Sequence, residues 1–152
     1  MGNDVFGQAA IQGYKNDKIN VNYVKVDQAE STGIALILVD SKGENCISVA
    51  SGANMKLDKS DIKDATVELD NADVVLMQLE TPIDTIEYII KLLKNKQVKT
   101  ILNPAPALKI SDDLLAHLTI ITPNETEVEL LTGVTVNDEK DALKAVSYTH
   151  LR

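Results

Sequence analysis

The sequence predicts an α/β fold: a doubly wound, mostly parallel sheet with helices on both faces, plus a small antiparallel hairpin. Over residues 55–146, short β-rich runs alternate with helical patterns, and strands joined through helices are normally parallel. Before this region, the strand-like runs 32–40 and 45–50 are separated only by residues 41–44, which contain a glycine. A loop of that length suits a hairpin. We therefore expect a parallel α/β region preceded by an antiparallel hairpin.

The first third of the chain contains one helical pattern and three strand-like runs. Val5, Ala9 and Tyr14 have approximate helical spacing, and a polar stretch then ends the pattern. The three runs that follow are rich in β-branched and other apolar residues and are separated by turn residues. We expect a short helix over residues 5–14 and strands over residues 21–26, 32–40 and 45–50.

The remaining elements alternate between helix and strand. The most distinct helix begins after Pro82, because proline is well tolerated in the first turn and apolar residues then recur on one face. Gly133 closes another helix, as glycine commonly does. The expected helices cover residues 58–69, 83–93, 111–117, 125–131 and 138–146, and the expected strands cover residues 74–79, 99–102 and 119–122.

Composition restricts the classes of function. The 152 residues are 44% hydrophobic and 25% charged, which suits one globular domain or part of a larger one. The formal net charge of -8 gives no positive field for a nucleic acid. The longest apolar run, residues 74–77, is far shorter than the ~18 residues of a membrane span. The single cysteine, Cys46, cannot form an internal disulfide, and the opening residues carry no secretory or lipidation pattern. We expect a cytoplasmic protein that binds neither nucleic acid nor membrane.

Three polar residues come directly at or after the predicted parallel strands: Glu80, Asn103 and Asn124. In an open parallel sheet the ligand site lies beyond the carboxyl ends of the strands. Glu80 could accept hydrogen bonds from a substrate hydroxyl, although a solvated loop acid is the simpler interpretation. Asn103 opens a stiff segment with two prolines that is expected to shape the wall of a crevice.

Asn124 and Glu127 allow two interpretations. Asn followed three residues later by Glu is the spacing of a capping box, in which both residues only begin a helix. The amino terminus of a helix also suits a phosphate, and Glu127 could then organise a magnesium ion, usually through water. Spacing alone favours capping, and the two roles can coexist.

Several motifs, taken together and in order, resemble the PfkB-type carbohydrate kinases, and in particular the members that phosphorylate ribose. The resemblance covers about residues 2–146. It rests on Glu30-Ser31-Thr32-Gly33-Ile34-Ala35-Leu36-Ile37, Gly43-Glu44-Asn45, Ser51-Gly52-Ala53-Asn54, Met77-Gln78-Leu79-Glu80, Asn103-Pro104-Ala105-Pro106-Ala107 and Ile121-Thr122-Pro123-Asn124-Glu125-Thr126-Glu127.

The resemblance implies a ribokinase-like fold whose β-lid covers the sugar. Residues 21–50 would supply lid strands and residues 55–146 the βα core, within a partial kinase domain of residues 1–146. The implied reaction is transfer of the ATP γ-phosphoryl group to the 5-hydroxyl of ribose, with Mg²⁺ bridging the phosphates and a monovalent cation, K⁺, activating from a site outside this chain. A homodimer through the β-lid is also implied.

The resemblance also implies roles for individual residues. Glu80 would contact the sugar, and Ala35 and Ile47 would lie on the lid side of the sugar pocket. Asn124 would touch the nucleotide phosphate, and Glu127 would be associated indirectly with magnesium. On this interpretation the Asn-x-x-Glu pair serves function as well as capping.

The sequence departs from the family pattern in what it does not contain. Family members are about twice as long. They have amino-terminal Asn-x-Asp and Gly-Gly-Lys-x-x-Asn motifs that hold the sugar, and a carboxyl-terminal Gly-Ala-Gly-Asp motif that supplies the anion hole and base. We therefore expect a middle fragment that is inactive by itself, with no catalytic residue of its own. Residues 147–152 continue a helical pattern without a stop signal and are expected to be a non-native or disordered tail.

Two alternatives remain at this point. The parent could be another PfkB-type kinase that acts on a different sugar or on a nucleoside. The chain could instead be a non-catalytic α/β binding or oligomerisation module that uses the hairpin as its contact surface, because an unpaired strand edge is adhesive.

Overall fold

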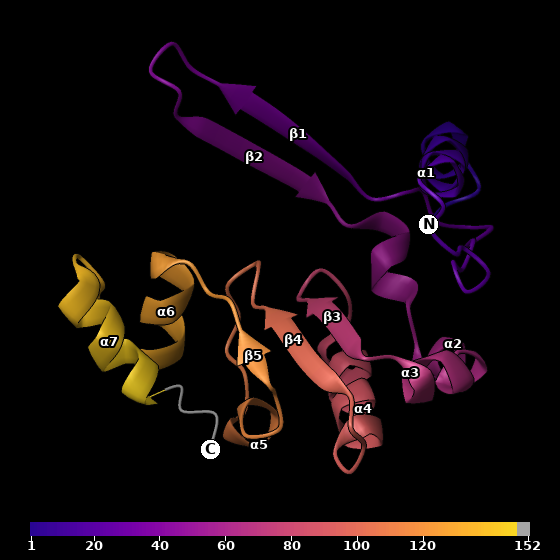
Figure 1. Cartoon of the computed structure of the whole chain (residues 1–152). Helices are drawn as coiled ribbons and strands as arrows, with labels where there is room; N and C mark the ends of the chain where they lie inside the picture. The colour runs from indigo at the N-terminus through magenta and orange to yellow at the C-terminus, as the bar shows by residue number, and fades with distance from the viewer. Residues whose placement is uncertain (149–152) are drawn as a thin grey trace. The chain divides into compact units, whose positions relative to one another are not determined.

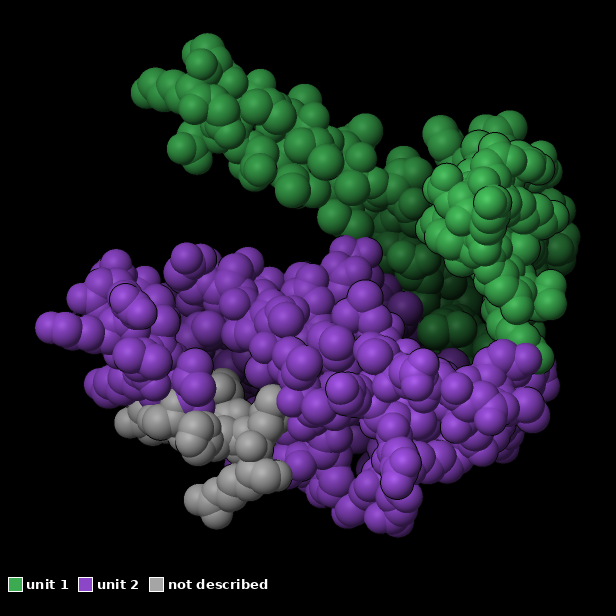
Figure 2. All heavy atoms as spheres, in the orientation of Figure 1, with its two compact units in different colours: residues 1–61 green, residues 62–152 purple. Residues whose placement is uncertain are grey.

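The computed structural model describes residues 1–148, with side chains described through Val146. The chain forms two compact units, residues 1–61 and residues 62–152 (Figure 2). None of the helices within residues 1–148 is long and apolar enough to cross a membrane.

Unit 1 begins with helix α1 (Val5–Asn16), which confirms the first predicted helix. The Asp4 side chain begins this helix by accepting a hydrogen bond from the Gly7 amide. Strands β1 (Ile34–Val39) and β2 (Asn45–Ala50) follow, and the 3₁₀ helix η1 (Gly52–Lys56) leads out of the hairpin.

Strands β1 and β2 form the predicted antiparallel hairpin (Figure 1). Ile37 pairs with Ile47, and Ala35 pairs with Val49. The Asp40 carboxylate accepts hydrogen bonds from the amides of Lys42 and Glu44, which fixes the loop. All twelve strand residues are exposed, so both faces of the hairpin present apolar side chains to solvent.

The strand predicted over residues 21–26 is wrong. The Val24 amide donates to the Val21 carbonyl at 3.0 Å, which makes this segment a turn. Nearby, Gly2 and Asp27 form only an isolated bridge. A β-rich pattern becomes a strand only where a neighbouring strand supplies hydrogen bonds. Among the described residues, the only strands of unit 1 are therefore β1 and β2.

The single helix predicted over residues 58–69 is also wrong, because two short helices occupy this region. Helix α2 (Lys59–Asp64) lies across the boundary between the units, and α3 (Thr66–Asn71) follows. The Thr66 hydroxyl donates to the Lys63 carbonyl at 2.8 Å. This bond satisfies a carbonyl group at the end of α2, next to Ala65, where the helix is interrupted.

Unit 2 contains the predicted parallel sheet, with strand order β3-β4-β5. Its strands are β3 (Val74–Gln78), β4 (Lys99–Asn103) and β5 (Ile120–Ile121). Helix α4 (Ile83–Leu93) connects β3 to β4, and the short α5 (Asp112–Leu115) connects β4 to β5 (Figure 1). This alternation confirms an α/β fold.

The core of unit 2 is built from one face of α4 and alternate residues of the strands. Ile86 and Ile90 of α4 are almost fully buried, as is Leu102 of β4. The other face of the sheet is open: Leu76 of β3 is 72% exposed, and Ile120 of β5 is also exposed. Apolar sheet surface is therefore left uncovered within the described chain.

Helices α6 (Glu125–Thr132) and α7 (Glu139–Tyr148) complete unit 2. Helix α6 ends at Gly133, whose φ of 72° lies in the left-handed region that glycine adopts without steric cost. Helix α7 continues two residues past the predicted boundary at 146. The rest of the tail predicted over residues 147–152, residues 149–152, lies outside the described residues.

Candidate functional site at the carboxyl edge of the sheet

The three parallel strands end at the same edge of the sheet. Gln78 at the end of β3 pairs with Asn103 at the end of β4. Beyond the strands, the Leu79 amide donates to the Ala105 carbonyl at 3.0 Å, and the Thr122 amide donates to the Leu102 carbonyl at 3.0 Å. These bonds hold the three strand exits together, so the segments that carry Glu80, Asn103 and Asn124 lie at one edge of the sheet.

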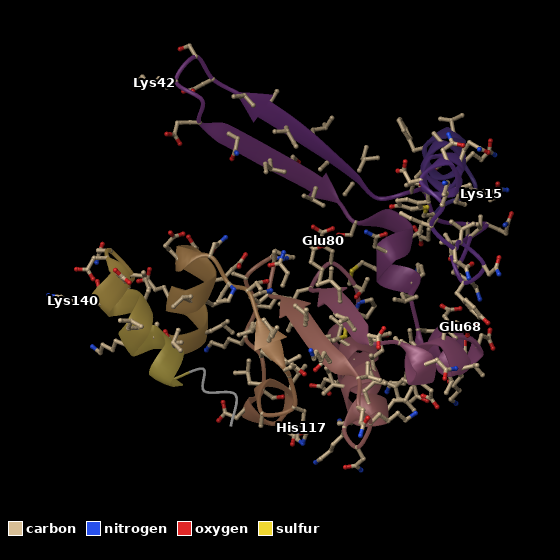
Figure 3. The ribbon with its side chains drawn as sticks, viewed as in Figure 1. Lys15, Lys42, Glu68, Glu80, His117 and Lys140 are labelled. Carbon is tan, nitrogen blue, oxygen red and sulfur yellow. The ribbon has the colours of Figure 1, made fainter. Side chains whose placement is uncertain are left out.

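Glu80 lies in the loop that leaves β3 and is exposed (Figure 3). The residue before it, Leu79, is 4% exposed and anchors the loop in the core. Across the described residues, no hydrogen bond to the Glu80 carboxylate is present. The carboxylate is therefore free to accept hydrogen bonds from a ligand at this edge.

The exit from β4 carries two prolines, Pro104 and Pro106. Asn103 is half-buried, and Pro104 is fully buried behind it. The Ala105–Pro106 peptide bond is cis. The bond from the Leu79 amide to the Ala105 carbonyl places this segment beside the exit from β3.

Asn124 and Glu127 form a complete capping box at the start of α6. The Asn124 Oδ1 atom accepts from the Glu127 amide at 2.9 Å, and Glu127 Oε2 accepts from the Asn124 amide at 2.9 Å. Asn124 Nδ2 also donates to Glu127 Oε1 at 3.1 Å. Glu127 is 6% exposed, whereas Asn124 is exposed and can be reached from solvent. This geometry confirms that the two residues cap α6. Because Asn124 is exposed, it is also accessible to a phosphate group.

The side chains of this edge fit magnesium only at a distance. Both Glu127 carboxylate oxygens already accept hydrogen bonds from Asn124. Among residues 1–148, no group of three or more His, Cys, Asp or Glu side chains could hold a metal ion. A buried, paired carboxylate suits contact with a magnesium ion through water rather than direct coordination.

The two lid residues predicted to face the sugar, Ala35 and Ile47, lie on the same face of the hairpin. Ile37 pairs with Ile47, and Ala35 is two residues from Ile37 on the same strand, so all three side chains point to one side. The opposite face carries Leu36, Leu38 and Cys46. The hairpin therefore has two apolar faces of different composition.

A cavity of about 290 Å³ beside the start of α6 was not predicted. Apolar residues from β5, α6 and α7 line most of it, and Asn124 and Glu125 line its polar part. The sequence offered one signal for this cavity, the spacing of apolar residues in the last helical pattern. That spacing does not show that α6 and α7 enclose a cavity.

A family model described as "pfkB family carbohydrate kinase" matches residues 1–151. The chain belongs to the pfkB family of carbohydrate kinases. This membership agrees with the resemblance seen in the motifs and with the parallel sheet whose strand exits carry Glu80 and Asn124.

Individual relatives agree with this assignment. The chain is 41% identical to the ribokinase of Haemophilus influenzae over 150 residues, which is 99% of the chain and 49% of that protein. It is 34% identical to a deoxyribokinase of Salmonella typhi, covering 97% of the chain and 48% of that protein. The structure of Arabidopsis thaliana ribokinase complexed with ribose and ATP superimposes with a TM-score of 0.86 at 30% identity, covering 99% of this chain and 49% of that one. The chain thus spans about half the length of these relatives.

Proposed function

We propose that this chain is part of an ATP-dependent ribokinase that converts D-ribose to ribose 5-phosphate. The observation that carries the proposal is the carboxyl edge of the sheet. There an exposed carboxylate, Glu80, follows β3, and a helix amino terminus with an accessible amide, Asn124, follows β5, the two strands that flank β4. A sugar kinase needs both a hydrogen-bond acceptor for hydroxyl groups and a place for phosphate.

Each part of the edge has a proposed role. Glu80 accepts hydrogen bonds from ribose hydroxyls. Asn124 contacts a nucleotide phosphate, while Glu127 holds Asn124 in place and reaches magnesium through water. The magnesium ion neutralises charge on the transferred phosphoryl group when ATP is bound. Ala35 and Ile47 lie on the hairpin face that covers the sugar.

The opposite hairpin face is proposed to form a homodimer. Ile34, Leu36 and Leu38 are all exposed on that face, and apolar side chains of this kind are a common basis for contact between subunits. The same observation favours the second candidate, a non-catalytic oligomerisation module, since the hairpin could associate without any kinase activity.

The isolated chain is proposed to have no kinase activity. Catalysis of phosphoryl transfer needs a base within hydrogen-bond reach of the attacking hydroxyl. The family's Gly-Ala-Gly-Asp motif, which the resemblance assigns to the anion hole and base, does not occur in these 152 residues.

The proposal is tested with a chimera in which residues 1–146 replace the matching half of the Haemophilus influenzae ribokinase. Activity of the chimera is measured with ribose, 2-deoxyribose, fructose and a nucleoside as acceptors. We expect ribose to have the highest kcat/KM, and Glu80→Gln to raise the KM for ribose more than it lowers kcat. A preference for 2-deoxyribose would assign the chain to a deoxyribokinase, and a folded chimera without turnover would favour the oligomerisation module.

A further inference from the structure

The base of the hairpin is tied to the start of α1 by contacts that the proposed kinase reaction does not explain. Every residue of β1 and β2 is exposed, so no packing along the strands holds the hairpin in one direction. Its direction relative to the rest of unit 1 must then be set where the chain enters at Gly33 and leaves at Ser51.

Asp4 joins the start of α1 to the entry of the hairpin. Its Oδ1 atom accepts from the Gly7 amide at 2.9 Å, which is the ordinary cap of α1. The same atom accepts from the Thr32 hydroxyl at 2.7 Å, and Oδ2 accepts from the Thr32 amide at 2.7 Å. The last two bonds reach across 28 residues of sequence to the position just before Gly33. Together these bonds lower the pKa of Asp4 to about 2 and keep it ionised.

The backbone around this carboxylate is packed at close range. The Gly2 amide donates to the Thr32 hydroxyl at 3.0 Å, and a Cβ atom at Gly2 would lie 2.4 Å from the Thr32 nitrogen. A Cβ atom at Gly33 would lie 2.6 Å from the Ser51 carbonyl oxygen, so the entry and the exit of the hairpin touch through their backbones. Gly52, with a φ of 51°, turns the chain away immediately afterwards.

We propose that Asp4 is a positioning residue whose bonds to Thr32 fix the direction of the lid hairpin. No packing along the strands holds the hairpin in one direction. The Asp4 carboxylate, however, accepts two hydrogen bonds from Thr32, which lies two residues before β1. Asp4 acts through Thr32 and touches no substrate. Only the link to function rests on the proposed kinase, in which Ala35 and Ile47 are the residues of the hairpin assigned to the sugar. The bonds between Asp4 and Thr32 do not depend on that function.

The alternative is that Asp4 only caps α1. Thr32→Val separates the two, because it removes the hydrogen bonds of the hydroxyl with Asp4 and Gly2. It leaves the cap on Gly7 and the bond from the Thr32 amide to Asp4 unchanged. Thr32→Ser keeps the hydroxyl and is the conservative control. Asp58→Asn is a matched control for loss of a carboxylate, since the Asp58 carboxylate accepts hydrogen bonds from the nearby Ser60 and Asp61 at the start of α2.

The experiment measures the direction of the hairpin in the 152-residue chain. Cys46, the only cysteine, is exposed on β2 and takes one spin label. Ala9→Cys, at an exposed position of α1, takes the other. Pulsed electron paramagnetic resonance then gives the distribution of distances between the two labels, and far-UV circular dichroism reports folding. No sugar or nucleotide is present, so the outcome is independent of the kinase assay.

We expect a narrow distribution for the parent, for Thr32→Ser and for Asp58→Asn. Thr32→Val and Asp4→Ser, which keeps a cap oxygen but loses the second acceptor, should broaden it about twofold, as larger motion of a segment would. A parental distribution in a folded Thr32→Val or Asp4→Ser chain would overturn the proposal. Unfolding of unit 1 in both variants would overturn it too, because the bonds would then serve stability alone.

Discussion

Replacing Glu127 by glutamine separates its role in the helix cap from a role in magnesium binding. In the parent, Glu127 Oε2 accepts from the Asn124 amide and Oε1 accepts from Asn124 Nδ2. Glutamine keeps one acceptor for the amide and loses the acceptor for Nδ2, which costs about 0.5–1.5 kcal/mol. It also removes a negative charge from the helix amino terminus, worth about 0.3–1 kcal/mol.

The free energy of unfolding of the 152-residue chain should therefore fall by about 0.8–2.5 kcal/mol in Glu127→Gln. Urea denaturation followed by circular dichroism measures this change. Glu125→Gln is the matched control, because Glu125 is an exposed acid in the same first turn and belongs to no cap. Glu125→Gln should lower the free energy of unfolding by no more than the effect of the lost charge, about 0.3–1 kcal/mol.

The same substitution in the chimera tests the functional role. If Glu127 reaches magnesium through water, Glu127→Gln should lower kcat and raise the magnesium concentration needed for half-maximal rate, while Glu125→Gln should leave both unchanged. Parental kcat and parental magnesium dependence in Glu127→Gln would refute the magnesium role and leave only the cap. An equal shift in both variants would indicate a general effect of charge.

Two further predictions concern stability. Leu102→Ala should lower the free energy of unfolding by about 2–5 kcal/mol, because Leu102 is 0% exposed. Leu76→Ala, at a 72% exposed position, should change it by less than about 0.5 kcal/mol. Equal losses for the two variants in urea denaturation would contradict the open face of the sheet. The pKa of Asp4 is lowered from 3.8 to about 2 by hydrogen bonds from Gly7 and Thr32, so its contribution to stability is complete above pH 3.8 and is lost as the pH falls through 2. Asp4→Asn should lack this acid-dependent loss, and an Asp4 carboxyl that titrates near 3.8 by NMR would contradict the bonds to Thr32.

The elements that the sequence predicts well are those in which a local pattern and the tertiary partner agree. Helix α4 has one apolar face that enters the core. The short glycine-containing loop predicts the antiparallel hairpin, although the loop observed between the strands is residues 40–44 instead of 41–44, and the hairpin register brings Ala35 and Ile47 to one face. The spacing of Asn124 and Glu127 predicts the capping box that is observed.

The elements that sequence analysis misses depend on contacts between distant residues or on one side chain. Residues 21–26 have the composition of a strand but form a turn, because no neighbouring strand pairs with them. Residues 58–69 have a continuous helical pattern, but the helix is interrupted at Ala65, where the Thr66 hydroxyl bonds to the Lys63 carbonyl. The bonds between Asp4 and Thr32 span 28 residues, so nothing in the local sequence reveals them beyond the preference of Asp for a helix start. The burial of Glu127 likewise follows from packing rather than from spacing.

The central claim is that this chain carries the sugar- and phosphate-contacting edge of a ribokinase but not its catalytic base. Ribose-dependent formation of ADP, measured in a coupled assay with Mg²⁺ and K⁺, tests it most directly. The chimera with Haemophilus influenzae ribokinase should turn over within the usual kinase range of about 1–100 per second, and the isolated 152-residue chain should show no turnover above the blank. Turnover of the isolated chain at about 0.1 per second, or a folded chimera that phosphorylates no sugar, would contradict the account.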